Sequence, residues 1–171
     1  VAFLQELPSL TPDRYRELAF GATSTSDGVT AVERCARCHG MDGMGRGGSF
    51  PVLAGQRADY LQNALRAYRE DRRHSGFMRP EAFELDDEAR HTVVRFFSGL
   101  ARVPRPRPAP RGMPTLVAAG QPSYEIPACV QCHGPGETDR NPAYPILDGQ
   151  PADYLFVQLM MFGVHRRGGS V

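Results

Sequence analysis

The sequence predicts an all-α protein made of two small helical domains in tandem. The first observation is an internal repeat with an offset of 94 residues, in which residues 51–56 (PVLAGQ) match residues 145–150 (PILDGQ) and residues 58–61 (ADYL) match residues 152–155. The second is that apolar residues recur at the spacing of one helix face, in segments that begin at capping residues and are separated by loops. Self-similarity at this size is typical of a structural unit used twice, not of a solenoid. A chain of 171 residues suits one or two small domains.

The helices follow from local patterns. Thr11 and Pro12 suit an N-cap and a first helical position, so a helix is expected to start there. Residues 58–72 place Tyr60, Leu61 and other apolar side chains on one face. Asp86 or Asp87 is expected to cap the closing helix of the first domain. The predicted helices are residues 29–38, 58–72 and 86–100 in the first half and residues 126–132 and 152–162 in the second.

The ends and the middle of the chain divide it further. Residues 1–10 resemble residues 94–100 in their apolar positions, which leaves two interpretations: the tail helix of a preceding domain, or an ordinary amphipathic helix. Residues 103–114 alternate arginine with proline and favour an extended linker, the alternative being a docking strip for an acidic partner. The expected divisions are 1–10 (tail helix), 11–102 (first domain), 103–115 (Arg/Pro linker) and 116–171 (second domain, truncated at its C-terminus).

Composition excludes some function classes. The formal net charge is +1, and all 20 basic residues are arginine. No basic stripe interleaves with aromatic residues, so nucleic acid is not an expected partner. No stretch is long and apolar enough to span a bilayer.

The motif Cys-x-x-Cys-His occurs twice and contains all four cysteines: Cys35, Cys38 and His39 in the first half, and Cys129, Cys132 and His133 in the second. This is the attachment signature of c-type haem, in which two thiols bond to the porphyrin and the histidine binds iron. A zinc site, a disulfide or a redox dithiol would also use paired cysteines. Those alternatives do not require the histidine that follows both pairs. The motifs therefore predict two covalent haems and one-electron chemistry.

The order of motifs, CxxCHG followed by P-x-L-x-G-Q-x-x-x-Y-L, a helix and a methionine, resembles the tandem dihaem cytochromes c of the cytochrome c4 type. The resemblance covers about residue 22 to the end. It implies two small class I cytochrome c domains, each wrapped around a covalent haem, and electron transfer on the periplasmic side of a bacterial membrane. Because c-type haem is attached outside the cytoplasm, it also implies export of the chain.

The same resemblance implies ligands and their supports. His39 and His133 would bind iron through Nε2, and the carbonyls of Pro51 and Pro145 would orient the two rings; the alternative for both prolines is turn formation. Met78 would be the sixth ligand of the first haem.

In the second domain the equivalent of Met78 falls at position 172, one residue past Val171. This agrees with the expected truncation. Met160 and Met161 are expected to be packing residues inside a helix, and His165 is the alternative ligand.

Arginine pairs recur near both ligand loops, and Arg73 and Arg167 suit bidentate pairing with haem propionates. Tyr60 and Tyr154 could also donate to propionates. The alternatives are solvated helix ends for the arginines and core packing for the tyrosines.

The function predicted from these residues is an electron carrier between a redox protein donor and a redox protein acceptor, in a respiratory or dehydrogenase chain. It would be periplasmic, and attachment to a membrane complex through a partner or a missing segment is left open. One alternative is a haem enzyme, either a dihaem peroxidase or an oxidoreductase of a sulfur compound, with one open haem site. The other is an interaction module built around zinc.

Overall fold

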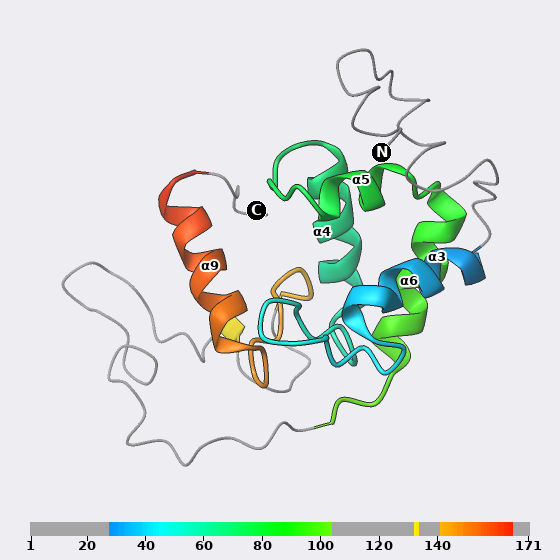
Figure 1. Ribbon diagram of the computed structural model, residues 1–171, viewed down its shortest axis with the longest axis horizontal. Helices are drawn as coiled ribbons and strands as arrows, with labels where there is room; N and C mark the ends of the chain where they lie inside the picture. Colours follow the sequence, from blue (N-terminus) through cyan, green and yellow to red (C-terminus); the bar gives the residue numbers. More distant parts are fainter. Residues whose placement is uncertain (1–27, 104–131, 134–140, 166–171) are drawn as a thin grey trace, which may run out of the picture.

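The computed structural model describes residues 28–103, 132–133 and 141–165. Five helices order these residues: α3 (Gly28–His39), α4 (Ala58–Arg69), α5 (Met78–Phe83), α6 (Asp87–Gly99) and α9 (Ala152–Gly163). The described part of the chain contains no strand, and the predicted all-α class is confirmed. α3 packs on α6, and α4 packs on both α5 and α6 (Figure 1).

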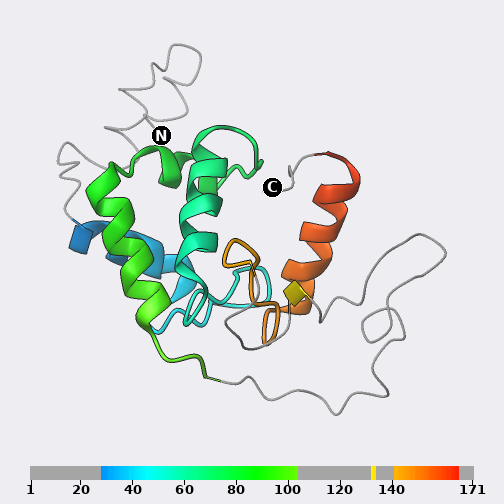
Figure 2. The same ribbon diagram turned by 180° about the vertical axis from the view of Figure 1, so that it is seen from behind.

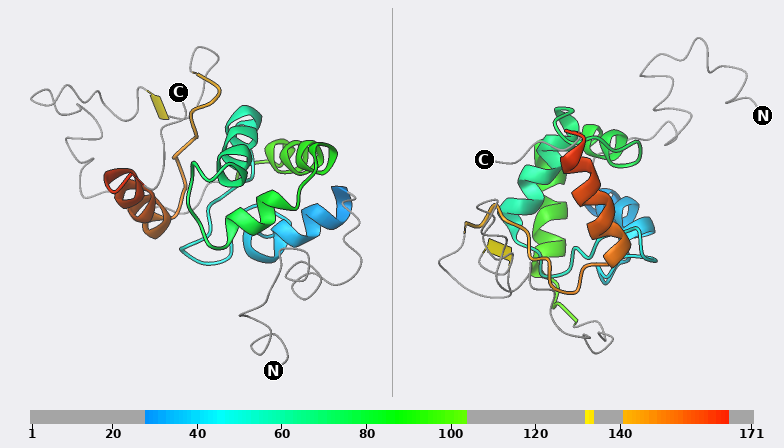
Figure 3. Two further views of the ribbon diagram at one scale, coloured as in Figure 1. Left: turned by 90° about the horizontal axis from the view of Figure 1, so that it is seen from above. Right: turned by 90° about the vertical axis from the view of Figure 1, so that its left-hand side faces the viewer.

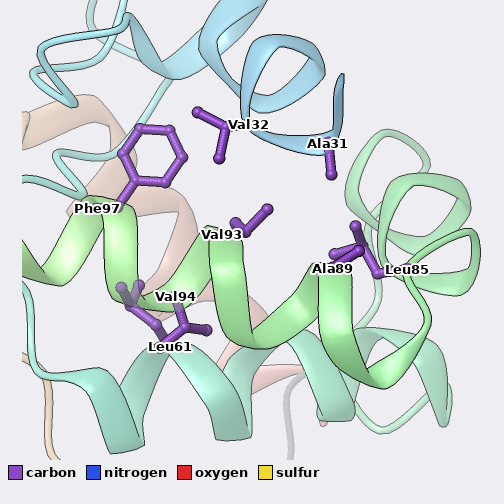
Figure 4. Packing of buried hydrophobic residues seen from close by; sticks show 8 residues of the cluster. All are labelled: Ala31, Val32, Leu61, Leu85, Ala89, Val93, Val94 and Phe97. Carbon is purple, nitrogen blue, oxygen red and sulfur yellow. The ribbon is translucent and has the colours of Figure 1, made fainter. Parts of the chain in front are cut away.

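The core of the first repeat lies where α3, α4 and α6 meet. Phe97 of α6 is fully buried, and Val32 of α3 and Leu61 of α4 approach the same helix from two sides (Figure 4). Small residues allow this close packing, since Ala31 and Ala89 are buried within the cluster. A covered aromatic side chain contributes most to such a small core, and its truncation costs about 3–5 kcal/mol.

The closing helix begins at the predicted cap. The Asp86 side chain accepts a hydrogen bond of 2.8 Å from the backbone N–H of Ala89 and satisfies one free donor of the first turn of α6. α3 likewise agrees with the prediction to within one residue at each end.

α4 ends at Arg69, three residues before the predicted end at Arg72. Asp71 takes a left-handed conformation with φ of 59°, and the N–H of Arg72 bonds back to the carbonyl of Ala67 at 2.9 Å. This is the Schellman arrangement, which usually uses glycine and is therefore hard to detect when aspartate occupies the position.

α9 of the second repeat ends in the same way. His165 has φ of 54°, and its N–H bonds the carbonyl of Phe162 at 3.1 Å. His165 and Asp71 are equivalent under the 94-residue offset, so the repeat extends to the helix terminus. Several apolar side chains of α9 are exposed in the described part of the chain: Phe156, Val157, Leu159, Met160 and Phe162.

The two repeats meet along their loops. Residues 141–151 run beside the loop between α3 and α4 (Figures 1 and 2), and hydrogen bonds join them directly. α4 lies between α9 at one end of the molecule and α3 at the other (Figures 1 and 3). The division of the chain into domains stays a prediction. The tail helix, the Thr11 helix start, the linker from residue 104, Cys129 and Arg167 lie outside the described residues.

Candidate functional site

The first cysteine–histidine motif lies in the last turns of α3. Cys38 and His39 follow Cys35 by three and four residues, so all three side chains share one side of the helix. Cys35 is half-buried, Cys38 is exposed and His39 is only 5 % exposed. One helix face therefore presents two sulfur atoms and an imidazole to the same region.

The imidazole of His39 is held by a backbone carbonyl. Nδ1 lies 3.1 Å from the carbonyl oxygen of Pro51, and the ring meets Phe50 edge-on with centroids 6.2 Å apart. Burial lowers the pKa of His39 below its usual value of 6.5, although the bond to Pro51 opposes this shift. Burial therefore favours the neutral ring, and because Nδ1 donates to the carbonyl, Nε2 is the nitrogen with a free lone pair for a metal.

The second motif repeats this geometry. Nδ1 of His133 lies 3.1 Å from the carbonyl oxygen of Pro145, and Tyr144 takes the place of Phe50 with a centroid distance of 5.8 Å. Cys132 is half-buried. The chain thus contains two sites with the same histidine support. In each site the proline that supplies the carbonyl lies twelve residues after the histidine.

The thiol chemistry of the first site does not suit a redox dithiol. Burial, assisted by the nearby Glu81 carboxylate, raises the pKa of the Cys35 thiol to about 12. A reactive cysteine needs a lowered pKa, because the thiolate is the nucleophile. Cys35 is thus a poor attacking group in this fold.

Among residues 28–103, 132–133 and 141–165, no group of three or more His, Cys, Asp or Glu side chains could hold a metal ion.

Arg73 connects the two repeats. Its side chain donates to the hydroxyl of Tyr154 at 2.9 Å and to Oε1 of Gln158 at 2.8 Å, both on α9, and more weakly to the hydroxyl of Tyr60 at 3.4 Å. The guanidinium also stacks over the ring of Tyr68 at 4.4 Å, within cation–π range.

Arg73 is only 5 % exposed, so the alternative of a solvated helix end is wrong for this residue. The neighbouring Arg72 does behave in that way, since it is exposed and pairs with Glu70. Tyr60 and Tyr154 both use their hydroxyls and are more than packing residues.

Among the residues that the structure describes, none forms an ion pair with the Arg73 cation. Its hydrogen-bond partners are neutral oxygens, and its buried Nε has no partner among the described residues. An unpaired buried charge is costly. A carboxylate such as a haem propionate would supply both the missing charge and the missing acceptor. The residues present therefore fit the cofactor that the motifs predict.

Met78 is the first residue of α5, a short helix that the apolar spacing of the sequence did not predict. The Met78 residue is half-buried, and its N–H donates to Oγ of Ser75 at 3.1 Å. Pro80 was an available signal, because proline is tolerated in the first turn of a helix, where its missing N–H costs nothing. In the second repeat, Met160 of α9 is 54 % exposed, so the expectation that it packs inside a core is wrong for the described part of the chain. His165, the alternative ligand, is also exposed and follows α9.

Two glutamines were not predicted as functional residues. Gln56 and Gln150 are equivalent in the repeat, and each bonds the backbone of the other repeat. The signal was the Gly-Gln pair in both aligned segments, which served only as evidence for the repeat.

Comparison with known proteins identifies the family. The family model described as cytochrome c matches residues 26–100. Cytochrome c4 of Pseudomonas aeruginosa is 30% identical over 155 residues, which cover 85% of this chain and 74% of that protein. The chain belongs to the cytochrome c family. The predicted likeness to dihaem cytochromes of the c4 type is confirmed.

Solved structures of similar proteins support the same family. Reduced recombinant cytochrome c4 from Pseudomonas stutzeri matches with a TM-score of 0.68 and 27% identity, over 83% of each chain. Thiosulfate dehydrogenase from Marichromatium purpuratum matches with a TM-score of 0.71 and 32% identity, over 86% of this chain and 34% of that one. This cytochrome has two c-type haems, with iron, as its cofactors.

A further set of relatives carries a more specific name. The thiosulfate dehydrogenase electron acceptor of Thiomonas intermedia is 32% identical over 142 residues, and that of Stutzerimonas stutzeri is 36% identical over 135. These alignments cover 80% and 75% of this cytochrome, which spans only 65% and 62% of the two relatives. Their names are those of electron carriers and favour that class over a haem enzyme. In the described part of the chain, no helix is long and apolar enough to cross a membrane.

Proposed function

We propose that this chain is a dihaem cytochrome that passes single electrons between protein partners in a respiratory or dehydrogenase chain of the bacterial periplasm. The observation that carries the proposal is the pair of equivalent histidine supports, His39 on Pro51 and His133 on Pro145, each following a haem attachment motif. A bound c-type haem supplies reversible one-electron exchange at iron. The protein supplies attachment, ligand orientation and charge.

Each residue of the sites has a stated task. Cys35 and Cys38 would tether the first haem, and Cys129 and Cys132 the second. His39 and His133 would bind iron through Nε2, because their Nδ1 atoms are held by the proline carbonyls. Met78 would be the second protein ligand of the first iron and would exclude small molecules from it.

Arg73 would serve both halves of the molecule. Its position between Tyr60 of α4 and Tyr154 of α9 supports a role in pairing with haem propionates at the junction of the repeats. Arg167 is the equivalent residue of the second repeat, and we propose the same task for it. A fixed cation near a haem stabilises the more negative, reduced state.

The names of the relatives point to the electron donor. Two relatives are called electron acceptors of thiosulfate dehydrogenase. We propose that this cytochrome likewise accepts electrons from a periplasmic dehydrogenase that oxidises a sulfur compound such as thiosulfate, and that it passes them to a second redox protein. Such contacts are small and short-lived.

The test uses the purified holoprotein. Haem quantification after acid–acetone extraction should find two haems that stay with each chain, and a catalytic amount of a thiosulfate dehydrogenase with thiosulfate should reduce both. The reduced protein should bind no carbon monoxide at the first haem, whereas Met78→Leu should bind it there. Extractable haem would refute the covalent sites, and thiosulfate oxidation by the cytochrome alone would refute the role of carrier.

A further inference from the structure

The junction of the repeats contains two reciprocal glutamine contacts. The side-chain amide of Gln150 accepts from the N–H of Val52 at 2.9 Å and donates to the Val52 carbonyl at 2.8 Å. The amide of Gln56 accepts from the N–H of Ile146 at 2.8 Å and donates to the Ile146 carbonyl at 3.0 Å. Each glutamine thus binds both backbone groups of one residue in the other repeat, between the loops that run side by side in Figure 2.

The residues bound in this way follow the prolines that hold the histidines. The Val52 N–H and the Pro51 carbonyl belong to one peptide group, and that carbonyl accepts from Nδ1 of His39 at 3.1 Å. A continuous hydrogen-bonded path therefore runs from Oε1 of Gln150, through one peptide group, to the ring of His39. The same path runs from Oε1 of Gln56, through the peptide of Pro145 and Ile146, to His133.

A peptide group transmits polarisation between its two ends. When its N–H donates, electron density shifts toward its carbonyl oxygen, and that oxygen becomes a stronger acceptor. A stronger bond at Nδ1 makes the imidazole a more basic ligand. A more basic ligand favours the ferric state of haem iron and lowers its reduction potential.

The surroundings make this effect large enough to measure. Gln56 is 2 % exposed and Val52 is 2 % exposed, so water competes little for these bonds. Hydrogen bonds in such surroundings are stronger and polarise one another more than in water.

We propose that Gln150 and Gln56 are positioning residues that set the reduction potential of the haem in the opposite repeat, Gln150 acting on His39 and Gln56 on His133. The inference rests on the proposed binding of iron by these histidines. It makes each potential depend on the docking of the two repeats, because separation would release both glutamines. The reduction potential of each haem would then change when the two repeats separate, because the hydrogen bond on its histidine would weaken.

The experiment replaces each glutamine in the full-length holoprotein. NMR monitors a potentiometric titration and reports the reduction potential of each haem separately. The methyl resonances of each haem are assigned through contacts with its own attachment cysteines. Gln150→Leu should raise the potential of the haem bound by His39, with a roughly two- to tenfold rise in its ferrous-to-ferric ratio at a fixed applied potential. Gln56→Leu should act in the same direction on the haem bound by His133. In each variant the Nδ1 proton of the affected histidine should move upfield.

Two further variants separate this path from simple loosening of the interface. Arg57→Ala removes a different bond between the repeats, from the guanidinium to the carbonyl of Asn141 at 2.9 Å, and should leave both potentials unchanged. Gln150→Glu keeps an acceptor for the Val52 N–H and should not raise the potential of the His39 haem.

The outcomes are distinguishable. A Gln150→Leu variant that shifts the His133 haem instead, shifts neither haem, or matches Arg57→Ala overturns the inference while leaving the proposed function intact. Loss of covalent haem in the unaltered protein would instead overturn the proposed function.

Discussion

Replacing Arg73 by leucine removes the interaction that joins α4 and its following loop to α9. The change deletes the donors to Tyr154 at 2.9 Å and Gln158 at 2.8 Å, and it deletes the stacking over Tyr68 at 4.4 Å. The two acceptors on α9, which are half-buried, lose the Arg73 donor. We expect both the stability of the protein and the potentials of its haems to fall.

The size of the effect follows from these contacts. A hydrogen bond from a charged donor contributes about 1.5–3 kcal/mol, and a cation–π contact about 0.5–2 kcal/mol. Desolvation of the buried guanidinium costs several kcal/mol and offsets part of this gain. We therefore expect Arg73→Leu to lower the free energy of unfolding by about 2–4 kcal/mol.

Unfolding of the holoprotein with guanidinium chloride, monitored by circular dichroism, measures the change in the free energy of unfolding. Spectroelectrochemistry measures the reduction potentials of the haems. Arg72→Leu is the matched control, because Arg72 is exposed and its pair with Glu70 is worth about 0–1 kcal/mol. If the two variants unfold at the same denaturant concentration and keep the same potentials, then Arg73 is not the junction cation described above.

Two other predictions concern the first repeat. Phe97→Ala should cost about 3–5 kcal/mol in the free energy of unfolding, and the 86 % exposed Phe77 should tolerate the same change, both measured by denaturant unfolding. Gly43→Ala should destabilise more than Gly47→Ala, although both glycines have positive φ. A Cβ at Gly43 would lie 2.8 Å from the backbone nitrogen of Ala54, whereas a Cβ at Gly47 would have no described atom within 4 Å; equal unfolding midpoints would contradict the clash.

Local sequence determined the chemistry and most helix positions. The CxxCH motifs predicted the cofactor, because two thiols and an imidazole at this short spacing are the attachment signature of c-type haem. The cap at Asp86 is equally local, because its side chain reaches an N–H only three residues away. The 94-residue repeat also made the second histidine support predictable from the first.

The tertiary structure alone decided how the two halves share their residues. Arg73 could have ended a solvated helix like Arg72, and it turns inward because α9 offers acceptors 81 and 85 residues away in the chain. Gln56 and Gln150 reach partners 90 and 98 residues distant. Such contacts depend on the register in which one repeat docks on the other. Neither periodicity nor spacing specifies that register, because every local pattern here is satisfied within a single repeat.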